Sequence, residues 1–280
     1  MSEFTLATFC DIIGISAASG IEYQDGQIYL LSDHSNYLYH YEMASTKLHK
    51  YVLQEHSPME QIEKPKKLDL EAMLYQDGRF YVFGSGSTPL RELGFSFSPQ
   101  NQQVDKLSLS DLYQRLRATA QIDELDFNLE AAASYGDHCL FLNRGNGPAG
   151  RNVLFTISDI NKPDSAVISA VDIALPQVNG LPFGFSGATL LDDTLFFIAT
   201  AEEGKSTYED GKIGGTLFGI IDLKTLKIVF TTLISKDQKF EGISVYQLHP
   251  DRLSFLLCED NDGLGDTATI YKLALDYPIQ

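Results

Sequence analysis

Five polar positions recur along the chain, and their side chains could carry chemistry. Each is followed by Gly or Ala and then by an apolar residue, and they are Ser19, Glu71, Glu130, Ser186 and Glu241. Three carboxylates brought to one place repel one another unless a positive charge lies between them or one of them is protonated. The positive charge could come from Arg91, from Arg144 or from a bound hard cation such as Ca²⁺, and a protonated glutamate could act as a general acid.

A structural role fits the same repetition, and the residues alone leave both alternatives open. In that role each glutamate accepts backbone N–H bonds from the neighbouring repeat and holds the repeats together. The two arginines also have two interpretations. A planar guanidinium can clamp a phosphate or a carboxylate with two parallel hydrogen bonds, or it can form an ion pair with a nearby glutamate.

A second polar column lies at the end of the following strand in each repeat. In the first four repeats it falls fourteen residues after the first column, and its members are Asp33, Ser85, Arg144, Thr200 and, in the fifth repeat, Asp260. The start of one strand and the end of its antiparallel partner lie on the same face, so the two columns should meet. We therefore predict catalytic roles for Glu71, Glu130 and Glu241, ligand binding by Asp33, Arg91, Arg144 and Asp260, and metal binding by Glu130 and Glu241.

The elements that must position these columns are strands of a long internal repeat. The repeats start at residues 19, 71, 130, 186 and 241, which gives spacings of 52, 59, 56 and 55 residues. Within each repeat, runs of β-branched and aromatic residues alternate with hairpin turns such as Asp25-Gly26 and Asp77-Gly78. About four strands per repeat match one blade of a propeller. The predicted fold is all-β, a five-bladed β-propeller, with six blades as the alternative if a degenerate blade lies in the second or third repeat.

The two ends of the chain predict how the ring closes. The fifth repeat supplies three strands, whereas residues 4–12 (FTLATFCDI) form an additional strand before the first repeat. We expect this strand to complete the last blade, because closure removes exposed sheet edges. Residues 108–121 (SLSDLYQRLRATAQ) are expected to form a short inserted helix, and residues 1–280 to form a single β-propeller domain.

Charge and composition argue against several classes of partner. The net charge of −17 and the pI near 4.6 repel nucleic-acid phosphates and anionic lipids, so we expect neither nucleic acid nor a membrane as partner. The N-terminal residues lack a basic region before an apolar stretch, which predicts a cytoplasmic location. Cys139 and Cys258 lie in apolar runs and are expected to be buried hydrophobic residues rather than disulfide partners.

Three motifs carry a resemblance to known proteins. The repeated (S/E)-(G/A)-apolar start, the GSGS stretch that leads to Arg91, and the NLEAAA and NRGN segments resemble a family of uncharacterised bacterial β-propellers. More remotely, these motifs are similar to phytase-like and esterase-like propellers. The resemblance implies a polar site at the channel mouth, at Glu71, Glu130, Glu241, Arg91 and Arg144. Lactonase-type propellers hold a divalent metal with carboxylate and amide ligands, a role that Glu130, Glu241 and Asn143 could imitate.

Two functions follow from these observations. The first is a metal-assisted hydrolase, in which the glutamates, a divalent cation such as Ca²⁺ and Arg144 act on a small anionic or sugar-like substrate, a phosphate ester or a lactone. The second is a non-catalytic propeller whose channel mouth binds a small molecule or a protein partner. The residues alone do not decide between an enzyme and a binding protein.

Overall fold

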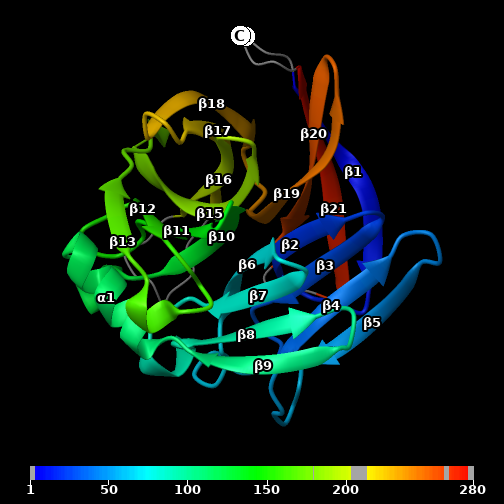
Figure 1. The fold of residues 1–280 in the computed structure, drawn as a ribbon. Helices are drawn as coiled ribbons and strands as arrows, with labels where there is room; N and C mark the ends of the chain where they lie inside the picture. Colours follow the sequence, from blue (N-terminus) through cyan, green and yellow to red (C-terminus); the bar gives the residue numbers. More distant parts are fainter. Residues whose placement is uncertain (1–3, 179, 203–212, 262–264, 277–280) are drawn as a thin grey trace.

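Five antiparallel sheets form a ring in the computed structural model, which describes residues 4–178, 180–202, 213–261 and 265–276 (Figure 1). Each inner strand contacts the inner strands of the two neighbouring sheets, and the fifth sheet contacts the first. The protein is therefore an all-β, five-bladed β-propeller, and the alternative with six blades is wrong.

The first three blades follow the chain in order, each from its inner to its outer strand. Blade 1 consists of β2 (Ala18–Gln24), β3 (Gln27–Ser32), β4 (Tyr37–Glu42) and β5 (Lys47–Val52). Blade 2 consists of β6 (Leu70–Gln76), β7 (Arg79–Gly84), β8 (Leu93–Ser98) and β9 (Gln103–Ser108). Blade 3 consists of β10 (Leu129–Tyr135), β11 (His138–Asn143), β12 (Val153–Ile157) and β13 (Ile168–Asp172).

The last two blades differ from this pattern. Blade 4 consists of β15 (Leu181–Leu191), β16 (Thr194–Glu202), β17 (Ile213–Asp222) and β18 (Lys227–Ser235), and the short β14 (Gln177–Val178) pairs with the start of β15. Blade 5 consists of β19 (Phe240–His249), β20 (Arg252–Glu259), β21 (Thr267–Asp276) and β1 (Phe4–Ile13). Because β1 pairs with β21, the N-terminal strand completes the last blade as predicted.

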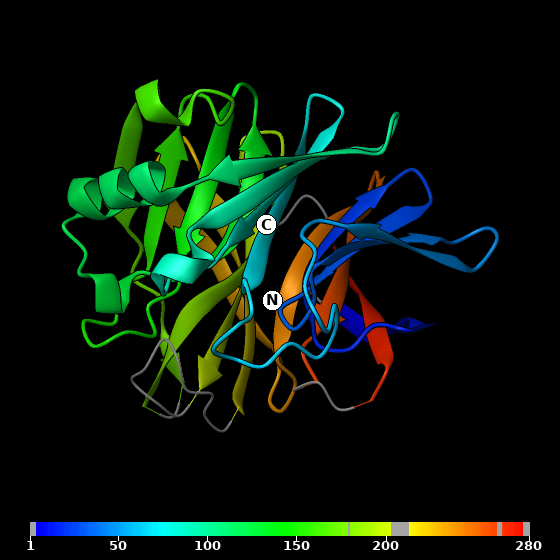
Figure 2. The same cartoon turned by 90° about the horizontal axis from the view of Figure 1, so that it is seen from below.

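The inserted helix is confirmed as α1 (Ser110–Ala120), which lies on the outside of the ring beside β13 (Figure 2). Its apolar face, which includes Leu112 and Leu116, is buried in the core between blades 2 and 3. Short 3-10 helices occur at Pro89–Arg91, Glu124–Asp126 and Pro163–Ser165. Among the described residues, no helix has the length and apolar composition that crossing a membrane requires.

The hydrophobic core is divided into five clusters, one between each pair of neighbouring blades. Both faces of every blade are therefore buried, which explains why the second strand of each repeat reads as a continuous apolar run. In β11, Cys139 and Phe141 pack toward blade 2, whereas Leu140 and Leu142 pack toward blade 4. Cys139 and Cys258 are buried and free, as expected.

A β-bulge recurs at the same place in every blade and positions the first polar column. The pairing of the inner strand with the second strand skips one residue in each blade, and the skipped residues are Ser19, Glu71, Glu130, Ser186 and Glu241. A bulge leaves the extra residue outside the ladder and can re-aim its side chain. The three glutamates consequently line the central channel.

The Gly or Ala that follows each bulge allows the inner strands to meet at the axis. A Cβ atom on Gly187 would lie 3.2 Å from the Cα atom of Gly242, and a Cβ atom on Gly242 would lie 2.8 Å from the backbone nitrogen of Ile21. Larger side chains at these positions would push neighbouring blades apart. The small residue of the repeat motif is thus a requirement of closing a ring with only five blades.

Candidate functional site

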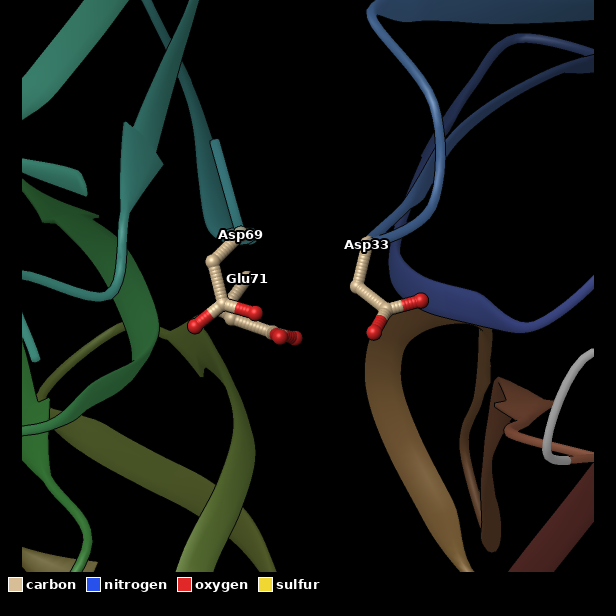
Figure 3. Close-up of side chains that lie close together, drawn as sticks. All are labelled: Asp33, Asp69 and Glu71. Carbon is tan, nitrogen blue, oxygen red and sulfur yellow. The ribbon is translucent and has the colours of Figure 1, made fainter. Parts of the chain in front are cut away.

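The two predicted columns meet at one mouth of the channel, as the antiparallel geometry requires. Asp33 at the end of β3 and Glu71 in β6 lie there together with Asp69, and oxygen atoms of the three carboxyl groups fall within 4.8 Å of one another (Figure 3). Lys67 lies at this cluster: its Nζ donates to Asp33 Oδ2 and lies 3.0 Å from Asp69 Oδ1. Lys67 and Asp69 are both buried and were missed by sequence reasoning.

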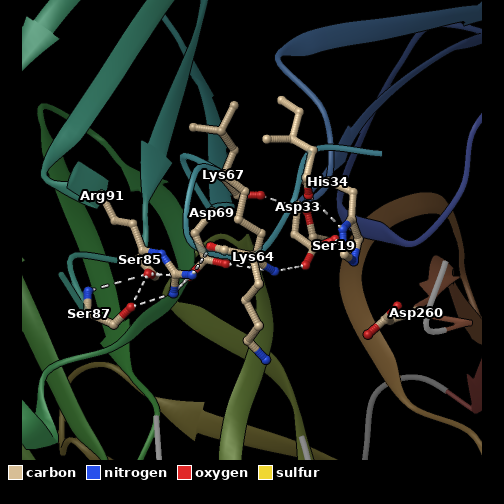
Figure 4. Close-up of polar contacts among 12 residues, drawn as sticks. Ser19, Asp33, His34, Lys64, Lys67, Asp69, Ser85, Ser87, Arg91 and Asp260 are labelled. Carbon is tan, nitrogen blue, oxygen red and sulfur yellow. Dashed lines mark hydrogen bonds and ion pairs between the residues drawn. The ribbon is translucent and has the colours of Figure 1, made fainter. Parts of the chain in front are cut away.

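Arg91 pairs with Asp69. Its Nη1 lies 2.6 Å from Asp69 Oδ2 and donates to Ser87 Oγ at 2.8 Å (Figure 4). Ser85, from the second column, donates to the same Asp69 oxygen at 2.6 Å. The guanidinium that could have clamped a ligand is therefore buried in a network within blade 2.

Arg144 contacts two of the predicted glutamates. Its Nη1 lies 3.4 Å from Glu130 Oε2 in its own blade and 3.7 Å from Glu241 Oε1 in blade 5. Lys239 adds a second positive charge to Glu241, at 2.8 Å, and its Nζ also donates to Asp260 at 2.9 Å. Of the alternatives left open by the sequence, these contacts match the ion pair between arginine and glutamate.

The two serines of the first column make backbone contacts that join neighbouring blades. Ser19 donates to the carbonyl oxygen of Leu70 at 2.7 Å, and Ser186 donates to the carbonyl oxygen of Phe240 at 2.8 Å. Each bond joins one blade to the next. No such backbone bond from a neighbouring blade is recorded for Glu71, whose side chain makes neither a hydrogen bond nor an ion pair with a described residue.

Asn143 lies apart from the glutamates that it was expected to join. Its Nδ2 donates to the carbonyl oxygens of Asp126 and Arg151, and its Oδ1 accepts from the backbone N–H of Asn128. All of these bonds tie together the loops that flank β11. A lactonase-like ligand set of Asn143 with Glu130 and Glu241 is therefore not assembled by this arrangement.

Burial and charge act in opposite directions on the carboxyl groups. Burial, together with the negative charges of Asp69 and Glu130, holds the pKa of Glu71 well above its ordinary value. Burial also raises the pKa of Glu241. Lys239 and Arg144 lower this pKa, Asp260 and Glu130 raise it, and the net shift is upward. Burial alone would raise the pKa of Asp69, but Lys67 and Arg91 together hold it below its ordinary value. The protonated form of Glu71 is consequently favoured more strongly than that of an ordinary glutamate.

Four buried oxygen atoms at the mouth have no hydrogen-bond partner among the described residues. They are Asp33 Oδ1, Glu71 Oε2, Asn128 Oδ1 and Thr200 Oγ1, and each comes from a different blade. Asp33 and Thr200 occupy equivalent positions of the second column, and Asn128 donates to Glu130 at 2.5 Å. Because buried polar groups are rarely left unsatisfied, this concentration marks the mouth as a place for a ligand or ordered water.

The channel narrows directly below the mouth. At the level of Glu71, Glu130 and Glu241, Ile21 and Met73 help to reduce the free space to about 10 Å³. This volume holds about one water molecule. The two ends of the channel are therefore separate compartments for anything larger than water.

The positive charge between the carboxylates comes from the protein's own side chains. Lys67 contacts two of the three carboxylates that lie within reach of one another, and Lys239 and Arg144 contact Glu241. An ammonium group in this place does not fit a hard dication that needs six to eight oxygen ligands, because cation and ammonium would repel. Calcium binding stays a prediction, and the arrangement favours lysine as the counter-charge.

Comparison with known proteins identifies the family of the chain. Residues 14–275 match the family described as "Family of unknown function (DUF6929)". The chain belongs to this family. No curated protein matches the sequence. Because the match covers nearly the whole chain, the mouth and the five bulges all lie within the family's segment.

Solved structures with the same architecture are distant in sequence. The major allergen Mala s 1 of Malassezia sympodialis superposes with a TM-score of 0.56 at 11% identity, covering 98% of each chain. Glutaminyl cyclase of Myxococcus xanthus gives 0.54 at 10% identity, covering 96% of this chain and 97% of its own. A luciferin-regenerating enzyme gives 0.52 at 9% identity, covering 97% and 95%. At these identities the likeness shows the fold alone.

A third column, polar in three of its five members, completes the mouth of this DUF6929 propeller and was missed by sequence reasoning. It lies two residues before each bulge and consists of Ala17, Asp69, Asn128, Gly184 and Lys239. In three repeats the sequence reads Asp-Leu-Glu, Asn-Leu-Glu or Lys-Phe-Glu, so that a polar residue lies two positions before the glutamate of the repeat motif. Alternate residues of a strand lie on the same face, so starting each repeat two residues earlier would have included this column.

The loops that follow the second strands lie on the side of the mouth and are called the loop face here; part of this face lies outside the described residues. The loops after β16 and β20 include residues 203–212 and 262–264, which the structure does not describe. Asp260 is described, and it contacts Lys239 at the edge of the mouth. All seven predicted site residues thus lie in the described part of the mouth, together with Lys67, Asp69, Asn128, Thr200 and Lys239.

Proposed function

We propose that the propeller binds a small, neutral, sugar-like molecule at the mouth formed by the three polar columns. The observation that carries the proposal is the set of four buried oxygens that make no hydrogen bond with a described residue, on Asp33, Glu71, Asn128 and Thr200. The His34 ring lies 3.5 Å from the Asp33 oxygen, beyond good hydrogen-bond distance. The oxygens of Asp33, Asn128 and Thr200 can each accept a hydrogen bond, and a ligand with several hydroxyl groups would donate to them. Such a site selects strongly for hydroxylated ligands, because an analogue that lacks a hydroxyl group leaves a buried polar atom of the protein without a hydrogen bond.

The charge balance of the mouth supports a neutral ligand. Six carboxyl groups, those of Asp33, Asp69, Glu71, Glu130, Glu241 and Asp260, face four cations, those of Lys67, Arg91, Arg144 and Lys239. The pKa values of Asp33, Glu71 and Glu241 are all raised, chiefly by burial, so the mouth disfavours a further negative charge from a ligand. Every one of these cations also contacts a carboxylate of the protein, so a phosphate ester would have to compete for it.

Two neighbouring threonines give a matched test. Thr200 Oγ1 has no partner, whereas Thr216, which pairs with it in the next strand, donates to the carbonyl oxygen of Gln238 at 2.7 Å. Removing the Thr200 hydroxyl relieves an unsatisfied group, so Thr200→Val should stabilise the fold by about 1 kcal/mol and weaken ligand binding about tenfold. Thr216→Val should destabilise the fold by a similar amount and leave binding unchanged.

Binding is measured by saturation-transfer NMR with D-glucose, myo-inositol and gluconolactone as probes, and stability by urea unfolding. Binding of at least one probe that Thr200→Val weakens and Thr216→Val retains would support the proposal. Equal binding by both variants, or no binding of any probe, would contradict it and would favour a protein partner at the loop face. A phosphorylated sugar that binds more tightly than its neutral parent would contradict the neutral class of ligand.

A second function, acid-catalysed hydrolysis of the bound molecule, is favoured by the raised pKa of the buried Glu71 carboxyl group at the mouth. A buried carboxyl group with a raised pKa can donate its proton to the leaving oxygen of a glycoside or lactone as the bond between that oxygen and the carbon breaks. Water adds to the carbon, and the proton that the water loses returns to the carboxylate. Glu71→Gln keeps the size of the side chain and removes the proton. If hydrolysis of a probe is observed, this variant should lose it while retaining binding, and unchanged hydrolysis would exclude Glu71 as the acid.

A further inference from the structure

A second cavity occupies the opposite end of the channel, below the constriction. Its volume is about 290 Å³. It is lined mainly by the third and fourth residues after each bulge, which are Glu22, Tyr23, Tyr75, Ala133, Ser134, Thr189, Leu190, Ser244 and Val245, with Gln24. Repeated strand geometry therefore builds this compartment just as it builds the mouth, but from different columns of the repeat.

The chemistry of this cavity is unlike that of the mouth. Among the described residues that line it there is no Lys, Arg or His, and Glu22 is the single acidic residue. Ser244 of blade 5 donates to Glu22 Oε2 at 3.2 Å and accepts from the backbone N–H of Tyr23 at 3.0 Å. The carboxyl group is thus held at the junction of blades 1 and 5, and it makes no ion pair with a described residue.

An isolated carboxyl group inside a protein costs stability, which makes it a candidate for function. Burial raises the pKa of Glu22 to about 8, and the hydrogen bond from Ser244 opposes this effect only in part. The other titratable groups that line the cavity are Tyr23 on β2 and Tyr75 on β6, whereas β10, β15 and β19 contribute none. No protein cation compensates Glu22 there, so the structure leaves its charge to be matched by something that enters the cavity.

We infer that this cavity is a second ligand site, separate from the mouth, and that it takes a small organic ammonium ion. Glu22 supplies the counter-charge, and the rings of Tyr23 and Tyr75 in the wall supply π surfaces of the kind that bind alkylated ammonium groups. The volume lies just below the range of about 300–1,000 Å³ that is usual for drug-sized ligands, so the ligand is small. An anion is disfavoured because the lining offers it no positive charge.

Choline and its neutral carbon isostere, dimethylbutanol, are the probes. The two molecules have nearly the same shape and differ in the positive charge, so they separate charge recognition from simple filling of the cavity. Calorimetry of the full chain at pH 8.5, where Glu22 is mostly ionised, should show choline binding at least about tenfold more tightly than dimethylbutanol. Equal affinities, or no binding of choline, would overturn the inference.

Three variants locate the site. Glu22→Gln keeps the hydrogen bond with Ser244 and removes the charge, so choline affinity should fall about tenfold or more. Glu63→Gln removes one negative charge from an exposed loop and should leave choline affinity unchanged. Tyr75→Leu should weaken binding several-fold through loss of the ring, which gives an independent result if one variant folds poorly.

The pH dependence provides a further readout. Because the carboxyl group must lose its proton to pair with the cation, choline should bind about tenfold more weakly near pH 6.5 than near pH 8.5. The Thr200→Val variant at the mouth should bind choline like the unmodified chain, so the failure of one site is distinguishable from the failure of the other. Choline affinity that is independent of both pH and Glu22 would contradict the assignment.

Discussion

Arg144 Nη1 lies 3.7 Å from Glu241 Oε1, and this pair joins blade 3 to blade 5 across the channel. The two blades are not neighbours in the ring, because blade 4 lies between them. Arg144 reaches so far because Gly184 of blade 4 has no side chain: a Cβ atom there would lie 2.5 Å from Arg144 Cγ. The mouth is therefore held together both by neighbouring strands and by a charged contact through its centre.

Replacing Arg144 by Met should destabilise the protein strongly. Glu130 and Glu241 would lose the guanidinium that contacts both, and removing one partner of a buried ion pair typically costs about 3–5 kcal/mol. Lys224→Met is the control, since Lys224 pairs with Asp193 at the exposed surface and should cost less than about 1 kcal/mol. Urea unfolding at neutral pH compares the two variants, and equal losses would mean that Arg144 does not stabilise the mouth.

Gly184→Ala should disturb the mouth without changing any charge. The added methyl group collides with the stem of Arg144, and overpacking of this kind costs about 1–3 kcal/mol. Gly20→Ala, in the inner strand of blade 1, meets no atom closer than 3.3 Å and serves as the control. We expect lower thermal stability and weaker ligand binding for the blade 4 variant than for the blade 1 variant; the reverse order would refute the role given to Gly184.

Glu71→Gln should change how stability depends on pH. The pKa of Glu71 is raised in the folded state, so the unfolded chain loses this proton first, and stability falls as the pH rises above the ordinary glutamate pKa of 4.5. The variant should match the stability of the unmodified protein near pH 4 and be the more stable of the two near pH 8. Urea unfolding at both pH values measures this difference, and parallel curves would show that Glu71 is ionised in the native state.

Lys67→Met tests which cation belongs among the carboxylates. Without the ammonium group, Asp33, Asp69 and Glu71 form a cluster of three carboxyl groups whose oxygens lie within 4.8 Å of one another, and oxygen ligands of this kind suit Ca²⁺. We expect CaCl₂ to raise the melting temperature of the variant, which is itself less stable, but not that of the unmodified protein. Tight calcium binding by the unmodified protein that is lost in Glu130→Gln would instead support the predicted metal site at Glu130 and Glu241.

The sequence determined the architecture because the signals that encode it are local and repeated. Strand runs, hairpin turns and the small residue after each bulge recur with the blade, and they predicted five blades, the closing strand and the inserted helix. The sequence also brought Glu71, Glu130, Glu241 and Asp33 to one mouth, because the start of one strand and the end of its antiparallel neighbour share a face.

The tertiary structure alone decided how these charges are paired. Lys67 precedes the repeat motif, and Lys239 occupies the position that Asp69 and Asn128 occupy in other blades. No repeated pattern therefore predicted either lysine as a partner of the carboxylates. Arg91 pairs with Asp69, whereas Arg144 extends across the channel and contacts Glu241. The distances between blades and the space left by Gly184 determine these pairings. Side-chain pairing depends on contacts far apart in the chain, and a pattern of period near 55 residues carries the fold but not those distances.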